Sequence, residues 1–239
     1  MLEGLNLGNV LFLDIETVPL YLNYQEVTSD FKKFWDKKAG LLSRSEDETP
    51  ESLFPRAGIY AEFGKIVCIS VGYLINVDGI STFRIKSFAG DDEKKLLEDF
   101  SELLNKSFYK KEHVLCAHNG KEFDFPYIAR RVLINGLKLP ALLDFAGKKP
   151  WEIPHLDTME LWKFGDYKSY TSLDLLASIF DIPTPKDDID GSEIHRVYWQ
   201  EKDLARIVTY CQKDVITVAK VLYKFIGKPF ISEEEIVIT

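Results

Sequence analysis

Acidic residues inside a short apolar run constrain the fold of this chain more than any other feature. The run from Asn9 to Ile15 is too short for an ordinary helix and is typical of a buried strand. Asp14 lies within it, and Glu16 follows two residues later. Because burying a lone charge is costly unless the charge is paired or binds a metal, these carboxylates indicate a functional site on a buried strand.

The spacing of these acids predicts which side chains face one another. Residues two apart on a strand point to the same side, about 6.6 Å apart along the chain, so Asp14 and Glu16 can share or bracket a divalent ion. Tyr210 and Asp214 are four residues apart on a predicted helix at 200–226, so they also share a side. The apolar stripe of that helix leaves Asp214 at its margin, where the pair can face a cleft beside a sheet.

The remaining periodicity predicts one α/β domain over residues 1–239. We expect further strands at 66–75, 80–88, 113–117 and 155–159, and helices at 96–108, 127–135, 160–164, 172–180 and 200–226. An Asp78-Gly79 turn joins the second and third strands into a hairpin. Residues 21–63 show no clean period and are interpreted as an insertion or lid with a helix or two.

Two more acids stand next to predicted strands. Asp124 ends the segment that follows the strand at 113–117 and is interpreted as a helix cap, with Pro126 in the first turn. Asp157 lies near the carboxyl end of the strand at 155–159. It is interpreted as the cap of the following helix; the alternatives are a residue that supports the metal ligands or an accessory ligand.

Charge and cysteine content limit the function classes. A formal net charge of −8 argues against a high-affinity, non-specific nucleic-acid binder, although bound cations would neutralise several of the acids. No apolar stretch approaches about 18 residues, so we expect neither a membrane span nor a signal peptide, and a cytoplasmic location. Cys68, Cys116 and Cys211 lie in apolar runs, which predicts reduced core thiols and argues against a disulfide framework or a Cys-ligated zinc site.

The four carboxylates at Asp14, Glu16, Asp124 and Asp214 would suit hard cations if the fold brought them together. Mg²⁺ and Mn²⁺ prefer oxygen ligands. Two such ions about 4 Å apart can stabilise both the attacking water and the leaving 3′ oxygen when a phosphodiester is cleaved. Crowded acids repel, so some of their pKa values should rise until metal binds, and activity should increase with pH and with metal.

In order and spacing, three motifs resemble those of the DEDD superfamily of 3′-5′ exonucleases. They are Asp14-Ile15-Glu16-Thr17, Asn119 followed by Phe123-Asp124, and Tyr210 followed by Asp214. The tyrosine marks the DEDDy branch, which includes RNase D and the proofreading domains of family B polymerases; Thr209 stands where the other branch has a histidine. With Asp190-Gly191-Ser192, the chain looks closest to stand-alone predicted exonucleases related to the family B proofreading domain.

The resemblance implies an RNase-H-like α/β fold, a mixed five-stranded sheet with its first three strands antiparallel and helices on its flanks. It also implies two divalent cations, Mg²⁺ or Mn²⁺. Asp14 would bridge them, Glu16 and Asp214 would complete the first site, and Asp124 would hold the second largely through water. Tyr210 and Glu16 would orient the attacking water. The substrate contacts implied are Thr17, Val18, Asn119, Phe123 and, as a phosphate contact, Lys186.

The expected function is therefore a metal-dependent 3′-5′ exonuclease that hydrolyses single-stranded DNA to 5′-mononucleotides. An RNase D-like exoribonuclease is one alternative, because the acids themselves do not discriminate the sugar. A catalytically silent nucleic-acid-binding module is the other. The presence of all four carboxylates and Tyr210 argues against the silent module.

Overall fold

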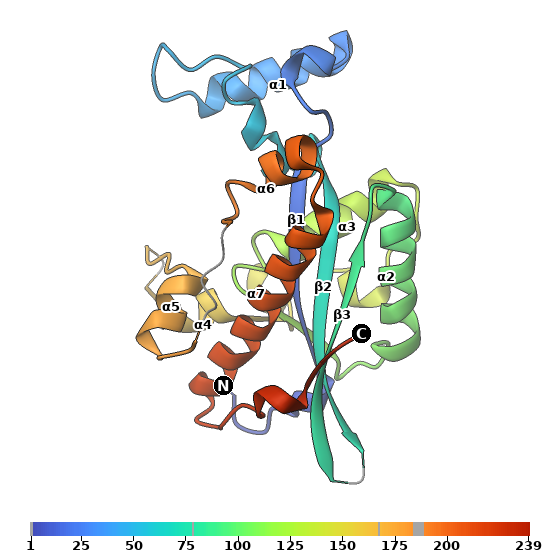
Figure 1. The fold of residues 1–239 in the computed structure, drawn as a ribbon, viewed down its shortest axis with the longest axis vertical. Helices are drawn as coiled ribbons and strands as arrows, with labels where there is room; N and C mark the ends of the chain where they lie inside the picture. The colour runs from blue at the N-terminus through green and yellow to red at the C-terminus, as the bar shows by residue number, and fades with distance from the viewer. Residues whose placement is uncertain (1, 78, 167, 184–188) are drawn as a thin grey trace.

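A six-stranded mixed sheet forms the centre of the computed structural model, which describes residues 2–77, 79–166, 168–183 and 189–239 (Figure 1). The strand order is β5-β4-β1-β2-β3-β6. The strands are β1 Val10–Pro19, β2 Gly64–Val77, β3 Ile80–Ala89, β4 Val114–Ala117, β5 Leu156–Asp157 and β6 Ile236–Ile238. The helices are α1 Ser29–Leu42, α2 Glu93–Ser107, α3 Asp124–Ile134, α4 Thr158–Lys163, α5 Leu173–Ile179, α6 Ile194–Arg196 and α7 Leu204–Phe225.

The sheet has the topology expected of an RNase-H-like fold. β1, β2 and β3 are antiparallel neighbours, and β4 and β5 continue parallel to β1 on its other side. The prediction of five strands was wrong by one, because β6 pairs in parallel with β3 through Phe83 and Ile236. Three residues at a sheet edge are too few to show an alternating pattern, so periodicity could not predict this strand.

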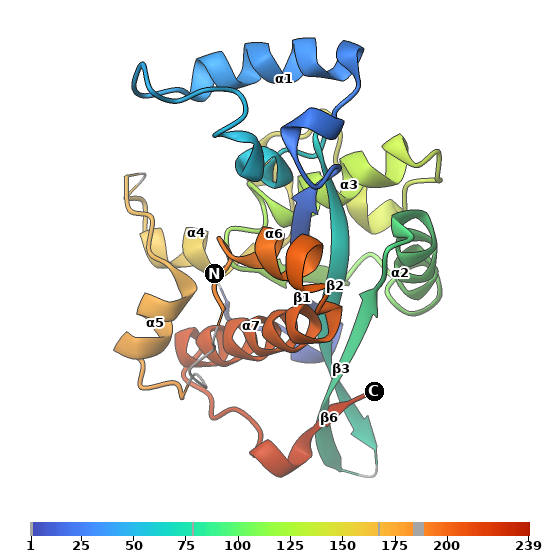
Figure 2. The same cartoon turned by 45° about the horizontal axis from the view of Figure 1, so that its top comes forward.

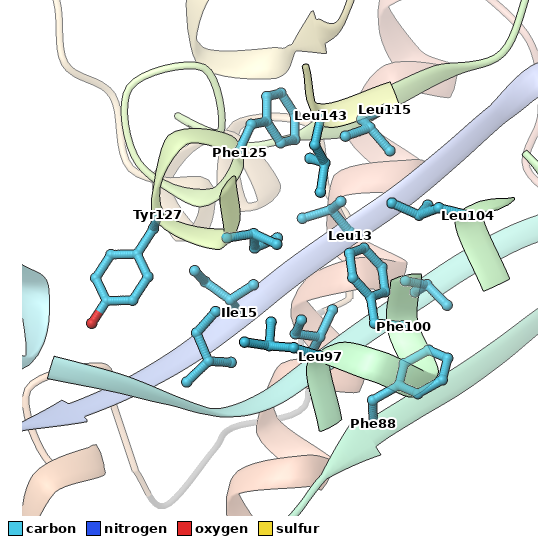
Figure 3. Close-up of a cluster of buried hydrophobic side chains, with 14 of the residues drawn as sticks. Leu13, Ile15, Phe88, Leu97, Phe100, Leu104, Leu115, Phe125, Tyr127 and Leu143 are labelled. Atoms are coloured by element: carbon cyan, nitrogen blue, oxygen red, sulfur yellow. The ribbon is translucent and has the colours of Figure 1, made fainter. Parts of the chain in front are cut away.

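The odd-numbered side chains of β1 lie in the larger apolar core. Leu11, Leu13 and Ile15 are buried between the sheet and helices α2 and α3. Figure 3 shows this cluster, in which the following residues surround β1: Phe88 of β3, Leu97, Phe100 and Leu104 of α2, Leu115 of β4, and Phe125 and Tyr127 of α3. The period of two in β1 therefore gives one face that is apolar from Leu11 to Ile15.

The even-numbered side chains of β1 face α7 and meet two separate apolar clusters. Val10 and Phe12 pack with a lower group from the second half of α7, Val215, Val218, Ala219 and Leu222. Val18 packs with an upper group that includes Ile207 of α7. Figure 2 shows α7 lying along this face of the sheet. Asp14 and Glu16 occupy the gap between the two clusters.

The last long helix begins later than the sequence predicted. Residues Val197–Glu201 form a π-helical turn, and Lys202 has a left-handed backbone, with φ of 58°. α7 then starts at Leu204, where the side chain of Asp203 accepts a hydrogen bond from the backbone N–H of Arg206 at 3.1 Å. The predicted start at 200 was wrong because an aspartate cap and a left-handed residue interrupt the apolar pattern.

Residues 21–63 carry α1 and a cluster of their own. Trp35 is fully buried there beside Phe54 and Phe63, and its Nε1 donates to the carbonyl of Pro50 at 2.7 Å. α1 lies beyond the end of the sheet at which β1 stops (Figure 1). Among the described residues, none of the helices has both the length and the hydropathy needed to cross a bilayer.

Candidate active site

Three elements bring the four predicted acids to one place. Asp14 and Glu16 project from β1 toward α7, Asp124 is the first residue of α3, and Asp214 lies in the middle of α7. Their charges act on one another: besides burial, the carboxylates of Glu16, Asp214 and Asp124 all raise the pKa of Asp14. The structure therefore assembles the constellation that the three motifs predicted.

The acids lie close together, and Glu16 and Asp124 are deeply buried. Glu16 is 7% exposed and Asp124 is 3% exposed. Burial raises the pKa of Asp124 to about 8, with Asp157 and Asp214 adding to the effect and backbone hydrogen bonds opposing it. Burial and then Asp214 also raise the pKa of Glu16 well above its ordinary range. Within the described ranges, no lysine, arginine or histidine forms an ion pair with Asp14, Glu16 or Asp124.

These carboxylates fit divalent cations on their own chemistry. Several ionised oxygens in a site poor in water would repel one another strongly unless positive charge joined them. Carboxylate oxygens are also the ligands that Mg²⁺ and Mn²⁺ prefer. The arrangement can therefore hold hard cations, and protonation at low pH would compete with them.

Tyr210 shares the margin of α7 with Asp214. Its ring is half-buried beside the upper apolar cluster. Burial, followed by the charges of Asp214, Glu16 and Asp14, raises the pKa of the phenol. The hydroxyl therefore keeps its proton at neutral pH and can donate a hydrogen bond into the site.

Asp157 fixes the loop that leads to Asp124. Its carboxylate accepts four backbone N–H groups, from Asn119 at 2.9 Å, Lys121 at 3.0 Å, Met159 at 2.9 Å and Glu160 at 3.2 Å. The last two cap α4, which confirms the interpretation of Asp157 as a helix cap. The first two tie α4 to the Asn119 loop, and Asn119 itself has a left-handed φ of 61°. Asp157 thus holds the acidic segment in a backbone conformation that it would seldom adopt alone.

The cap of α3 lies one residue earlier than predicted, so Asp124 is the first residue of the helix and not its cap. α3 begins at Asp124 with Phe123 in the capping position, so the carboxylate belongs to the first turn of the helix. Pro126 follows in the same turn, and the helix ends just before Gly136, which has a left-handed φ of 71°. The difference is one residue and leaves the carboxylate at the positive end of the helix.

The predicted substrate contacts are less uniform. Val18 is fully buried under α7, and the side chain of Thr17 is directed to the opposite face of the sheet, near the hydroxyl of Tyr127. Phe123 packs against the ring of Tyr127, with centroids 5.4 Å apart, and stays half-buried with Asn119. The side chains of Thr17 and Val18 are therefore engaged within the protein, which leaves their backbone as the group that could meet a nucleotide. Lys186 lies outside the described residues.

The sequence reading missed a thiol at this site. The Sγ of Cys211 and one carboxylate oxygen each of Asp14 and Glu16 all lie within 4.8 Å of one another. Residues three apart on a helix are neighbours, so the position of Cys211 three residues before Asp214 was the available signal. On β2, Ser70 continues the polar surface through a 2.9 Å contact with Ser87, whose Oγ accepts from the side-chain amide of Gln212 at 2.9 Å.

Comparison with known families was consistent with this geometry. A family model described as a predicted 3′-5′ exonuclease related to the exonuclease domain of PolB matches residues 59–226, more than half of the 239 residues. The match contains Asp124, Tyr210 and Asp214, whereas Asp14 and Glu16 precede it. In the fold, β1, which carries Asp14 and Glu16, lies between β2 and β4 of the matched range.

Proposed function

The chain belongs to this family of predicted 3′-5′ exonucleases related to the exonuclease domain of PolB, and from that premise we propose a specific activity. It hydrolyses single-stranded DNA from the 3′ end, in a reaction that depends on two Mg²⁺ or Mn²⁺ ions, and releases 5′-mononucleotides. The observation that carries the proposal is the assembly of four acids from three elements, with no protein cation paired to Asp14, Glu16 or Asp124 among the described residues.

Each acid has a separate role in this proposal. Asp14 bridges the two cation positions, Glu16 and Asp214 complete the first, and Asp124 holds the second largely through water. The cations supply charge that stabilises the attacking and leaving oxygens of an in-line displacement at phosphorus. Because Asp14 and Glu16 lie on a stretch of β1 that is paired with β2, they hold their positions without reorganising when substrate binds.

Tyr210 and Glu16 orient the attacking water. The raised pKa of the phenol keeps Tyr210 a hydrogen-bond donor, while Glu16 accepts from the same water. The water is then fixed between one donor and one acceptor. Such positioning aligns it with the scissile phosphorus before reaction.

Nucleotide binding involves the Asn119 loop and the end of β1. Asn119 and Phe123 are half-buried near Asp124, and Thr17 and Val18 contribute backbone groups beside Glu16. Lys186 completes the proposed set as a phosphate contact. Residues 21–63, which follow directly on the end of β1, form an insertion within a single exonuclease domain and act as a lid. A cytoplasmic location suits the buried thiols of Cys68, Cys116 and Cys211.

A time course on matched oligonucleotides tests the activity. Single-stranded DNA and RNA of one sequence, each blocked at the 3′ or the 5′ end, are incubated with the protein in Mg²⁺, in Mn²⁺ or in chelator. We expect DNA blocked at its 5′ end to shorten to mononucleotides only with metal, and DNA blocked at its 3′ end to remain intact. Preferred cleavage of RNA would assign the RNase D-like alternative, and binding without cleavage in either metal would assign the silent module.

A further inference from the structure

Two aromatic rings are exposed on the segment that joins α4 to α5. Phe164 is 90% exposed and Tyr170 is 66% exposed. Phe164 caps the end of α4 with a left-handed φ of 44°, a conformation that helix ends commonly give to glycine and that strains a bulky residue. The burial of apolar surface does not account for a phenylalanine at this position. The exposed rings therefore indicate a contact with another molecule.

The segment adjoins two parts of the active site. Nε2 of His118 donates a hydrogen bond to the backbone carbonyl of Thr171 at 2.9 Å, and His118 immediately precedes the Asn119 loop. Burial is the main cause of the raised pKa of Tyr210, and the charge of Asp174 in the first turn of α5 adds to it. α4 and α5 both pack against α7, on its side away from α2 (Figures 1 and 2). The segment thus continues from the edge of the active site.

Lys163 holds the ring of Tyr170 beside the same loop. Its ammonium lies 4.2 Å from the centre of the ring and 3.9 Å from a carboxylate oxygen of Glu122, two residues before Asp124. The side chain of Lys163 is only 13% exposed, so it supports the ring from within and leaves most of the ring open to solvent. Phe164 follows Lys163 directly in the chain. Both exposed rings therefore adjoin this one lysine.

Exposed rings of this kind suit the unpaired bases of single-stranded nucleic acid. Every base has a π-face, so stacking on an aromatic side chain requires no particular sequence. Binding through phosphates alone would need a basic surface. The chain has a formal net charge of −8, and the charge of Lys163 is balanced by Glu122. Contacts to bases must therefore supply a larger share of the affinity here.

We propose that Tyr170 and Phe164 form a stacking platform for bases of the single-stranded substrate, on the 5′ side of the nucleotide that is removed. The place of the platform on the substrate path rests on the proposed function, while its affinity for single-stranded nucleic acid does not. Bases stacked there keep the strand unpaired as its 3′ end enters the site. Because stacking does not depend on the sugar, the platform accepts DNA and RNA alike.

Binding is measured on the full chain in chelator, where the proposed metal-dependent cleavage is blocked. A thymidine oligonucleotide labelled with fluorescein at its 5′ end is titrated, and its anisotropy gives the Kd. We expect Tyr170→Ala and Phe164→Ala each to raise the Kd by roughly 5- to 150-fold. Tyr170→Phe keeps the ring and should bind like the unaltered protein. Tyr109→Ala is the matched control, because Tyr109 is 65% exposed and precedes β4, whereas the Asn119 loop follows that strand.

Cleavage in Mn²⁺ separates the platform from the acids. The p-nitrophenyl ester of thymidine 5′-monophosphate carries a single nucleotide, so it occupies the acids without a base on the platform. The ratio of kcat/KM for a long oligonucleotide to that for the ester should fall in both alanine variants and stay constant in Tyr109→Ala.

Two outcomes distinguish the platform from the proposed function. If the Kd and the cleavage ratio are the same in both alanine variants as in the unaltered protein, the platform is wrong and the nuclease proposal stands. The same holds if the unaltered protein cleaves but does not bind the labelled oligonucleotide. Binding that depends on the two rings, without cleavage of either substrate, would support the platform and reject the proposed function.

Discussion

β1 sends its odd-numbered side chains toward α2 and α3 and its even-numbered side chains toward α7, and the two faces are built differently. On the first face, Leu11, Leu13 and Ile15 join one continuous apolar core. On the second, Asp14 and Glu16 separate two apolar clusters. Neighbouring residues thus serve stability and chemistry in turn, because the period of two in a strand keeps them on opposite sides.

The comparison also shows how a polar gap can be kept in an apolar layer. The apolar clusters on either side of the acids hold both halves of α7 against the sheet. This packing keeps Asp214 of α7 close to Asp14 and Glu16 of β1. Gly72 of β2 helps α7 approach, since a Cβ there would lie 2.7 Å from Val215. The acids are therefore positioned by packing that they do not take part in.

Replacing an acid should have the largest effect, and it should lower cleavage without lowering stability. Asp14→Asn keeps the shape of the side chain but removes the charge proposed to bridge both cation positions. We expect cleavage to fall on the order of a thousandfold, about 4 kcal/mol in transition-state stabilisation. The free energy of unfolding of the metal-free protein should not fall, because a buried charge has been removed. Single-turnover rates and chemical denaturation measure the two effects, and full activity would show that Asp14 is not a ligand.

The residue one position earlier should show the opposite behaviour. Leu13→Ala removes a fully buried side chain from the α2 and α3 face and should lower the free energy of unfolding by about 3 kcal/mol. Cleavage per folded molecule should change little at a temperature where the variant remains folded. Denaturant titration and active-site-normalised rates test this. A thousandfold loss of activity here would mean that the two faces are not independent.

Tyr210→Phe sharpens the comparison within the α7 face. The substitution keeps the ring that packs beside the upper cluster and removes only the hydroxyl. We expect kcat to fall about tenfold, the value of one hydrogen bond to the attacking water. Mn²⁺ affinity, measured by calorimetry, should equal that of the unaltered protein. A weaker Mn²⁺ affinity would instead make Tyr210 part of the cation site.

The most gradual effect should appear as a pH slope in the metal-free protein. Asp124 has a pKa of about 8 in the folded chain and an ordinary value near 4 when unfolded. Between these values the folded state binds the proton and the unfolded state does not. Stability should therefore fall as pH rises, by about 1.4 kcal/mol per pH unit for this group.

Denaturation in chelator across pH 4 to 8 measures this slope. Asp124→Asn should flatten it, and Mg²⁺ should restore stability mainly at the upper end, where the acids are free to bind it. A slope that is unchanged in Asp124→Asn would assign the proton to another of the acids.

Much of the fold could be predicted because its signals are local. The apolar run of β1, the amphipathic face of α2 and the aspartate that caps α4 each follow from a few neighbouring residues. The three motifs also predicted which strand or helix carries each of the four acids. Periodicity and capping depend on short stretches of chain, so they survive without knowledge of tertiary contacts.

What could not be predicted depends on contacts between distant segments. β6 forms by pairing with the edge strand β3, which is distant in sequence. The start of α7 depends on a π-helical turn that local propensity does not encode. The contacts of Thr17 and Val18 within the protein could not be predicted for the same reason. They depend on which face of the sheet each side chain points to. The meeting of Cys68 with Cys211 required the packed helix.

The place of β1 in the sheet has a practical consequence. A chain cut to the matched residues 59–226 would keep Asp124, Tyr210 and Asp214 but lose the strand that separates β4 from β2. Both halves of the sheet would then have an open slot lined by backbone groups that need a partner. We expect a synthetic peptide carrying residues 9–20 to pair in that slot and to bring Asp14 and Glu16 with it. Residues 59–226 alone therefore hold only two of the four acids and lack the strand that joins the two halves of the sheet.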